Sequence, residues 1–489
     1  MHLTYISDVQ AIVPECFLLC AAMGLLGLGS WIGTSPTYQY PTLLPRMIYL
    51  ALLSIGITFL LVLNNPIYEA VVCSGSLATD TLAATLKTLL LGTAGAILAV
   101  SVCYYRNEQM NAFEVAILLL LALASMMLLV SANDFVTVYL TLEFQSLSLY
   151  VLAASKRDSE LSTEAGLKYF FLGALASGMY LLGCSFFYAA TGTLHFESIA
   201  HILDSPENCT PLGLLGLLFC GIAFLFKGTV APFHIWAPDV YEGAPTPITA
   251  FFGTVPKIAI FGVLARLYSW GFASCVSVWQ PFFLVAGALS LLVGSSWALA
   301  QPRIKRLLAF SSIGHVGFFM IALSCATQEG IEAFLVYLGL YICMSLCVFT
   351  ILLGMNAQTT RVKYIQDFAM LGKTAPVVAG TLGMTFFSMA GIPPFAGFFA
   401  KLHVLLAACA HDLWGVALYA VIVSVISCFY YIRVVKVLYF EPTEDWVAFH
   451  PLDKIGAGIL TLSFFALLGF VLYPTGYLTF IHWTSLQCA

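Results

Sequence analysis

Charged side chains are scarce in this chain of 489 residues. Lys, Arg, Asp and Glu make up only 9% of it, and 61% of the residues are hydrophobic. Soluble domains carry about 25% charged residues. The mean hydropathy is also high, at +0.96. The composition therefore excludes an ordinary soluble protein and predicts an integral membrane protein.

Basic clusters and metal-binding motifs are lacking as well. The formal net charge is -5 and the basic residues are scattered, which excludes a nucleic-acid surface. The 14 cysteines form no CxxC or Cys/His pattern with the spacing of metal ligands. We interpret pairs such as Cys343 and Cys347 as apolar packing residues, so we expect no metal or iron–sulfur cluster on this chain.

The first ten residues contain Asp8 and neither lysine nor arginine. They therefore resemble neither a transit peptide nor a secretion signal. If the protein functions in an organelle, we expect it to be encoded and made there.

Long apolar stretches are what the sequence does contain. A membrane helix needs about 20 apolar residues, and the chain offers about fourteen such stretches. Short polar turns separate them, so we expect an all-α polytopic protein whose chemistry lies inside the membrane. The stretches begin near Val9, Pro45, Leu82, Phe113, Phe135, Glu164, Pro211, Pro245, Val276, Lys305, Gly330, Ala375, Leu413 and Ile455.

The positions of the basic residues support this number of crossings. Loops on the cytoplasm-equivalent side are enriched in Lys and Arg. With fourteen crossings nearly all loop cations fall on one face, and the other face receives only Arg266 and Lys87. Both termini then lie on the face that is poor in basic residues. The cations of the basic face are Arg46, Arg106, Lys156, Arg157, Arg303, Lys305, Arg306, Arg361, Lys363, Lys373, Arg433, Lys436 and Lys454.

Prolines interrupt the seventh and the twelfth predicted helix. Pro232 follows Lys227 by five residues, and Pro393 and Pro394 precede Lys401. A proline breaks the helical hydrogen-bond ladder, and lipid tolerates such a break only where protein or water satisfies the backbone. A packing kink is the alternative interpretation. One lysine precedes its break and the other follows it, so the two are not equivalent in sequence.

Breaks five helices apart predict two inverted five-helix repeats with discontinuous helices 7 and 12, which is a transporter architecture. We expect three N-terminal helices over 1–112 and a first repeat over 113–270. The second repeat is expected over 271–440, and a loop with helix 14 over 441–489.

Five ionisable residues lie within apolar helices. A charge at mid-membrane costs about 2.5–3.5 kcal/mol, so such residues are functional candidates by default. Glu143 lies mid-helix and needs a cation or a proton, and Lys227 is its natural partner. Lys257 and Lys401 are candidate proton carriers, because a buried lysine can shed its proton. Lys168 lies near a helix end, where snorkelling to the interface is an equal alternative.

Two histidines are candidate proton relays because histidine titrates near physiological pH. His234 follows the first break, and His315 lies within a helix beside two serines. Each could equally be a core histidine with satisfied hydrogen bonds. Static ion pairing is likewise the alternative for Glu143 and Lys227.

Three segments carry a family resemblance: LFKGTVAPFHIWAPDVYEGAPTPITAF, KRLLAFSSIGHVGF and AGIPPFAGFFAKL. From about Phe113 to Phe440 the chain resembles the antiporter-like subunits of the proton-pumping NADH:ubiquinone oxidoreductase, respiratory complex I. The PDVYEG stretch is most similar to subunit 2. Two further stretches, KRDSELSTEAGLKYF and SCFYYIRVVKVLYF, resemble its mitochondrial form from plants and algae.

The resemblance implies a proton-translocating role in the mitochondrial inner membrane. It implies a glutamate–lysine pair at Glu143 and Lys227, a central lysine at Lys257 and a charged residue of helix 12 at Lys401. FMN, the iron–sulfur clusters and ubiquinone would then belong to other subunits, with no cofactor on this chain. Neighbouring antiporter-like subunits, and lipids such as cardiolipin, are the expected partners, and the termini are expected in the intermembrane space.

Three alternatives remain at this point. A stand-alone cation/proton antiporter shares the inverted repeats and would transport ions by itself. A chloroplast NADH dehydrogenase-like subunit would keep the same residues in another compartment. A scaffold would use the charges only for pairing.

Overall fold

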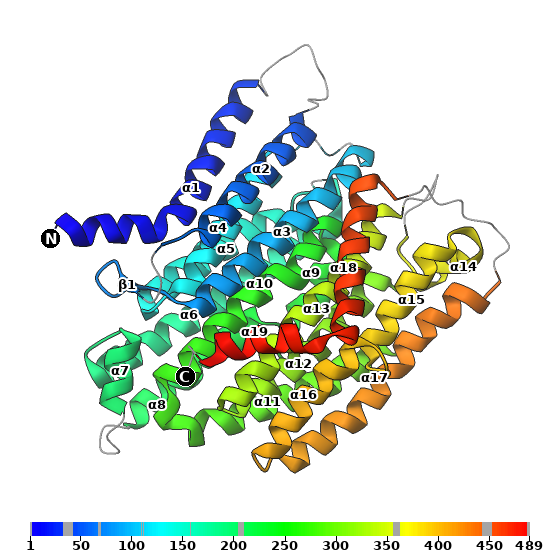
Figure 1. Cartoon of the computed structure of the whole chain (residues 1–489). Helices are drawn as coiled ribbons and strands as arrows, with labels where there is room; N and C mark the ends of the chain where they lie inside the picture. The colour runs from blue at the N-terminus through cyan, green and yellow to red at the C-terminus, as the bar shows by residue number, and fades with distance from the viewer. Residues whose placement is uncertain are drawn as a thin grey trace. The chain divides into compact units, whose positions relative to one another are not determined.

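Helices make up nearly the whole described chain (Figure 1). The computed structural model describes residues 2–32, 43–66, 70–108, 110, 112–156, 158–203, 210–355, 362–442 and 452–486. Within these ranges twelve helices are long and apolar enough to cross a membrane. They are α1 (His2–Ile32), α2 (Leu43–Leu63), α3 (Thr81–Asn107), α4 (Glu114–Ser131), α5 (Phe135–Ala153), α6 (Glu160–Thr191), α10 (Thr246–Arg266), α11 (Val276–Ala298), α12 (Ile304–Ser324), α13 (Gln328–Gly354), α17 (Trp414–Phe440) and α18 (Lys454–Leu472).

The two remaining predicted crossings are the interrupted ones. The seventh consists of α8 (Pro211–Lys227), a loop that contains Pro232, and α9 (Trp236–Gly243). The twelfth consists of α15 (Pro376–Ala390) and α16 (Ala396–Ala410), with Pro393 and Pro394 between them. The structure therefore confirms an all-α polytopic fold of about fourteen crossings with helices 7 and 12 discontinuous. The repeat boundaries stay a prediction.

Several small elements were not predicted. The loop after α2 contains an antiparallel hairpin of β1 (Ala70–Val72) and β2 (Leu77–Thr79). The loop after α6 contains α7 (Phe196–Leu203), and α14 (Leu371–Thr374) and α19 (Pro474–Leu486) are also short helices. The hairpin turn requires a left-handed backbone at Gly75 (φ 94°), a conformation that glycine adopts at no steric cost. These elements are too short for a hydropathy pattern to mark.

Polar residues at the helix ends explain where several helices start. Asp80 caps α3, with its side chain accepting from the Ala83 amide at 2.8 Å. Thr210 caps α8 and Thr327 caps α13 in the same way. Such caps satisfy backbone donors that have no partner within the helix. At the other end of α6, Gly192 (φ 73°) provides the left-handed cap that ends the helix.

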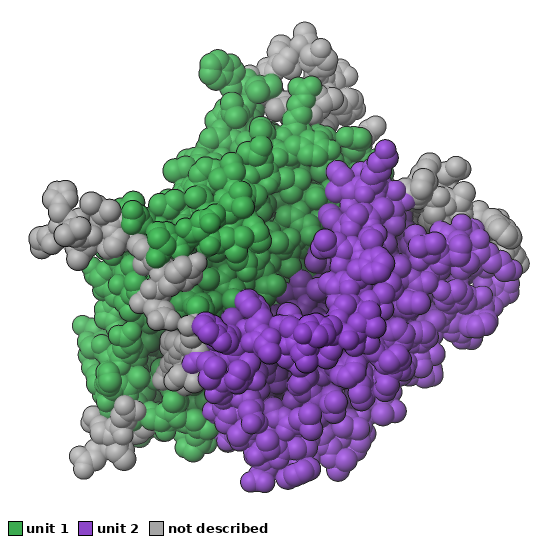
Figure 2. All heavy atoms as spheres, in the orientation of Figure 1, with its two compact units in different colours: residues 1–228, 243–279, 487–489 green, residues 229–242, 280–486 purple. Residues whose placement is uncertain are grey.

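The chain forms two compact units, coloured separately in Figure 2. The first contains Met1–Gly228 and Gly243–Trp279, and the second contains Thr229–Glu242 and Gln280–Leu486. The first break therefore lies next to a unit boundary, because Lys227 belongs to the first unit and the loop after Gly228 to the second. Each unit holds part of the predicted site.

An ion pair that the sequence did not predict links α1 and α3 inside the first unit. Lys87 Nζ lies 2.5 Å from Glu15 Oε1, and the exposed fractions of the two side chains are 8% and 2%. Lys87 was expected at the membrane face, but it is buried. Pro14 lies inside α1 directly before Glu15, and α1 bends in Figure 1, as expected where a proline removes a helical hydrogen bond. The charged pair thus joins the N-terminal helix to its neighbours.

Replacing Lys87 by alanine should destabilise the first unit strongly. Removing one partner of a buried ion pair leaves an uncompensated charge and typically costs about 3–5 kcal/mol. We expect a lower midpoint of thermal unfolding for purified Lys87→Ala, with partial recovery when Glu15→Gln is added.

Lys436→Ala is the matched control, because Lys436 pairs with Glu441 at 3.5 Å while its side chain is 65% exposed. Such a pair contributes about 0–1 kcal/mol. If Lys87→Ala and Lys436→Ala lowered the midpoint of thermal unfolding equally, the stabilising role of the buried pair would be contradicted.

Candidate functional site

Glu143 and Lys227 lie in the first unit, on α5 and α8. Lys227 is buried, with 7% exposure. Glu143 Oε1 is buried and has no hydrogen-bond partner among the described residues. In the described chain no nitrogen–oxygen distance of 4.0 Å or less joins the two residues. The structure places both residues in the first unit, but not in a direct ion pair.

Tyr150, which the sequence did not single out, contacts Lys227 instead. Lys227 Nζ donates to the Tyr150 hydroxyl at 3.3 Å and lies 5.6 Å from the centre of the Tyr150 ring. The tyrosine therefore provides a hydrogen-bond acceptor to the buried ammonium.

The position of Lys227 at the end of α8 adds a further electrostatic contribution. Lys227 is the last residue of the helix. The last carbonyls of a helix carry a partial negative charge, and a cation in the last turn is stabilised by about 0.3–1 kcal/mol, more when it is partly buried. The break thus places a lysine where the backbone favours its charged form.

Lys401 reaches the equivalent end of the second broken helix. Its Nζ donates to the carbonyl oxygen of Ala390 at 2.7 Å, and Ala390 is the last residue of α15. Both lysines therefore lie near the C-terminal end of a first half-helix, Lys227 as the last residue of α8 and Lys401 through its hydrogen bond to Ala390. The asymmetry between them remains, because the ammonium of Lys227 bonds to the Tyr150 hydroxyl and that of Lys401 to a backbone carbonyl oxygen.

The packing around Lys401 depends on Gly391. Gly391 has a left-handed backbone (φ 85°), and a Cβ atom built on it would lie 2.8 Å from Cδ and 3.0 Å from Nζ of Lys401. Phe318 of α12 covers the ammonium, which lies 5.4 Å from the ring centre. Only glycine fits both the backbone conformation and the space that the lysine occupies.

His315 connects three helices of the second unit. Its Nδ1 lies 2.9 Å from the Tyr337 hydroxyl on α13, and its Nε2 lies 3.1 Å from the Tyr431 hydroxyl on α17. One ring nitrogen of a neutral histidine donates and the other accepts. Both alternatives for His315 therefore stand: its hydrogen bonds are satisfied, and they form a chain along which a proton could pass.

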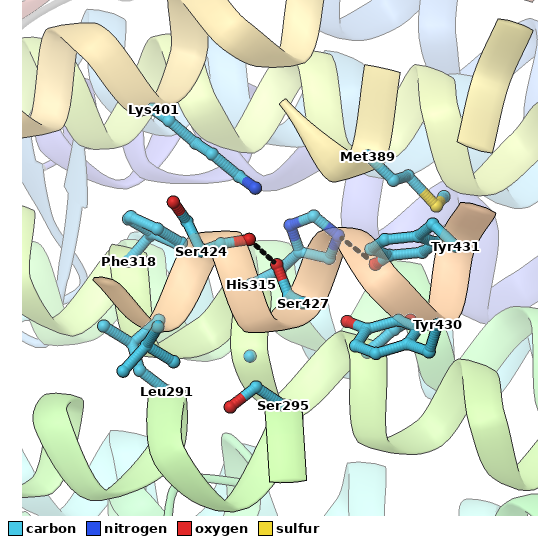
Figure 3. Close-up of a pocket in the computed structure, with 13 residues that line it drawn as sticks. Leu291, Ser295, His315, Phe318, Met389, Lys401, Ser424, Ser427, Tyr430 and Tyr431 are labelled. Carbon is cyan, nitrogen blue, oxygen red and sulfur yellow. Dashed lines mark hydrogen bonds between the residues drawn. The ribbon is translucent and has the colours of Figure 1, made fainter. Parts of the chain in front are cut away.

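Lys401 and His315 line the same small cavity (Figure 3). Figure 3 shows the lysine amino group directed toward the serines of α17 and the histidine ring. The cavity volume that is open to the centre of a water molecule is about 20 Å³. This is enough for about one water. A single water could therefore connect the lysine to the histidine chain.

The remaining candidates differ in their surroundings. Lys257 is 1% exposed on α10, a helix that is buried from Pro247 to Arg266. Lys168 pairs with Glu164 at 2.7 Å, and its side chain is 42% exposed. The arrangement of Lys168 is compatible with snorkelling as much as with transport.

His234 lies in the loop after the first break, within the second unit. It is 9% exposed, and its Nδ1 has no hydrogen-bond partner in the part of the chain that the structure describes. The Ala231 amide of the same loop donates to the Ser290 hydroxyl of α11 at 2.8 Å. The loop is thereby held on α11, and one histidine nitrogen stays available.

Ion pairs fix the segment after His234. Glu242 pairs with Arg303, and Asp239 pairs with Arg306 at 3.1 Å. Carboxylates of α9 and arginines at the start of α12 thus form a charged cluster. In the described ranges no group of three or more His, Cys, Asp or Glu side chains is arranged to hold a metal ion.

Comparison with known proteins identifies the family. A family described as "NADH:quinone oxidoreductase/Mrp antiporter, TM" matches residues 132–427. The NADH-ubiquinone oxidoreductase chain 2 of Marchantia polymorpha is 44% identical over 474 residues, which cover 96% of each chain. The chain belongs to this NADH:quinone oxidoreductase/Mrp antiporter family.

Two further members of the family support the assignment. Chain 2 of Arabidopsis thaliana is 41% identical and covers 98% of this chain and 96% of its own length. A chain of respiratory complex I from Thermus thermophilus superposes with a TM-score of 0.80 at 29% identity, covering 95% of this chain and 98% of that one. The family resemblance inferred from the three sequence segments is confirmed. The roles of individual residues stay predictions.

Gly391→Ala should disturb Lys401 without removing it. The new methyl group would displace the lysine stem and would also impose a left-handed conformation on alanine, which costs about 1 kcal/mol. We expect reduced proton uptake by vesicles that contain the assembled protein. Gly380→Ala, in the helix α15 that Gly391 ends, is the control, because its Cβ would meet nothing closer than the Tyr439 hydroxyl at 4.0 Å among the described residues. Equal activity of the two variants would contradict the importance of this contact.

His315→Leu should lower stability by about 1–3 kcal/mol, because it removes the imidazole partner of the buried Tyr337 and Tyr431 hydroxyls. His315→Gln can still donate and accept, so it should recover part of the loss. Thermal unfolding of the two purified variants checks this expectation. Equal midpoints for the leucine and glutamine variants would show that the hydrogen bonds contribute little.

Proposed function

We propose that the chain is a membrane-arm subunit of respiratory complex I that translocates protons across the mitochondrial inner membrane. Electron transfer from NADH to ubiquinone on other subunits would drive it. The observation that carries this proposal is the full-length similarity to NADH-ubiquinone oxidoreductase chain 2. It is supported by two buried lysines, Lys227 at the end of α8 and Lys401 bonded to the last residue of α15.

The chain itself would perform no redox chemistry. FMN, iron–sulfur clusters and ubiquinone would be held by other subunits. Neighbouring antiporter-like subunits are the proposed partners, with cardiolipin among the surrounding lipids. The distribution of basic loop residues supports termini in the intermembrane space.

The proposed path uses the lysines in sequence. Protons would be taken up near Lys168 or His234, pass Lys257, and leave past Lys401, with His315 as a further relay. Glu143 would modulate Lys227. Moving one charge against 100 mV requires about 2.3 kcal/mol, and a hydrogen bond to a charged group contributes about 1.5–3 kcal/mol. The free-energy change when a buried lysine exchanges one hydrogen-bond partner for another is therefore comparable with the cost of moving its proton against the membrane potential.

Lys227→Ala and Glu143→Gln should lower quinone-linked proton uptake about tenfold in vesicles containing assembled complex, which corresponds to about 1.4 kcal/mol of lost coupling. Uptake is normalised to complex content and to NADH oxidation with an artificial acceptor. Lys436→Ala serves as the control for loss of an exposed lysine. Normal pumping in all three variants would show that Glu143 and Lys227 have only a structural role. It would favour the alternative in which the chain is a scaffold whose charges only pair.

A stand-alone antiporter is the second candidate, because the matching family includes Mrp antiporters. It predicts cation-dependent proton movement in vesicles that contain only this chain. Transport there, with no dependence on NADH, would replace the proposed function.

A further inference from the structure

We propose that Tyr150 is the resting partner of Lys227, and that Tyr150 and Glu143 alternate in binding the lysine ammonium. This inference rests on the proposed function. It assigns Tyr150 as a positioning residue for the proton carrier Lys227. In this structure Lys227 binds Tyr150, and Glu143 Oε1 has no hydrogen-bond partner among the described residues.

The first observation concerns one carboxylate oxygen of Glu143. Its Oε1 is buried without a hydrogen-bond partner in the described chain, although a buried lysine lies in the same unit. A buried polar atom without a partner is costly and uncommon in native structures. The arrangement is therefore one end state of a pair whose second state joins Glu143 to Lys227.

The placement of the two acceptors on α5 is the second observation. Tyr150 follows Glu143 by seven residues in one unbroken helix. At about 100° per residue, seven positions return to nearly the same face, about 10 Å further along the axis. Both acceptors thus face the same direction. The flexible four-carbon stem of lysine allows one ammonium to move between them.

The rigidity of Tyr150 is the third observation. Its ring packs edge-on against Tyr169 at 4.7 Å and against Phe170 at 5.7 Å between ring centres, both on α6. Its hydroxyl occupies the space that a side chain at Gly173 would fill. Because α6 fixes the ring, the lysine side chain rather than the tyrosine must move.

The two acceptors bind the lysine ammonium with different strengths, and this difference decides which of them holds it. A tyrosine hydroxyl is neutral and forms a weaker bond to an ammonium than a carboxylate does. An ionised Glu143 should therefore attract Lys227 away from Tyr150, and a protonated Glu143 should release it. Tyr150 then prevents the released ammonium from being left buried without a partner.

The first test compares Tyr150→Phe, Glu143→Gln and the double variant in vesicles with assembled complex. Tyr150→Phe keeps the ring and removes the hydroxyl. We expect it to lower quinone-linked proton uptake per electron several-fold, with normal NADH oxidation by an artificial acceptor. In the Glu143→Gln background it should change uptake by less than about twofold, because the alternation is already lost.

Tyr180→Phe is the matched control. Tyr180 is also buried, but its hydroxyl donates to the Phe135 carbonyl at 3.2 Å and not to a lysine. Its loss should leave the proton-to-electron ratio unchanged. The inference would be overturned if Tyr150→Phe had a normal ratio of protons taken up per electron. It would also be overturned if the fold-decreases of Tyr150→Phe and Glu143→Gln multiplied in the double variant.

A second variant covers the case in which Tyr150→Phe fails to assemble. Gly173→Ala places a methyl group where the hydroxyl lies and leaves the phenol intact, so it should reproduce the lowered ratio. Gly178→Ala on the same helix is its control, because a Cβ there meets no atom of the described residues within 4 Å. A normal ratio in Gly173→Ala would overturn the inference.

The variants distinguish a failure of the proposed function from a failure of the role of Tyr150. If Lys227→Ala and Glu143→Gln leave pumping intact, the proposed function of this pair is wrong. If those variants lose pumping while Tyr150→Phe and Gly173→Ala do not, the function stands and only the role of Tyr150 is overturned.

Discussion

The carbonyl end of an interrupted helix is the feature on which both halves of the candidate site depend. A helix that stops inside a membrane leaves carbonyl oxygens that water cannot reach. Here α8 ends in Lys227, and the last carbonyl of α15 accepts from Lys401. Each lysine therefore lies near the partial negative charge at the end of a half-helix. At the second break the lysine also satisfies one of the carbonyl oxygens directly.

Much of this arrangement could be predicted from the sequence. Lysines within apolar stretches and prolines a few residues away mark the breaks, because each violates the local pattern of a membrane helix. The direct contacts could not be predicted. Tyr150, Tyr337 and Tyr431 lie in apolar helices where tyrosine is common, and no local signal separates a tyrosine that binds lysine or histidine from one that packs.

The pair of Glu15 and Lys87 shows a second limit of the sequence. Topology assigned Lys87 to the membrane face because it lies near a predicted helix start. Its partner is far away in the sequence and on another helix, so only the packing of α1 against its neighbours brings them together. Lys168 differs: its pairing with Glu164 follows from the helical spacing, and its half-exposed position leaves both interpretations open.

The burial of α10 has a consequence for how the protein is made. Lys257 would cost about 2.5–3.5 kcal/mol if its helix faced lipid alone. In the first unit α10 packs against α3, α4 and α8, all of which leave the ribosome before it. The earlier helices can therefore receive α10 as it enters the bilayer. The order of synthesis shortens the time during which this cation is exposed to hydrocarbon.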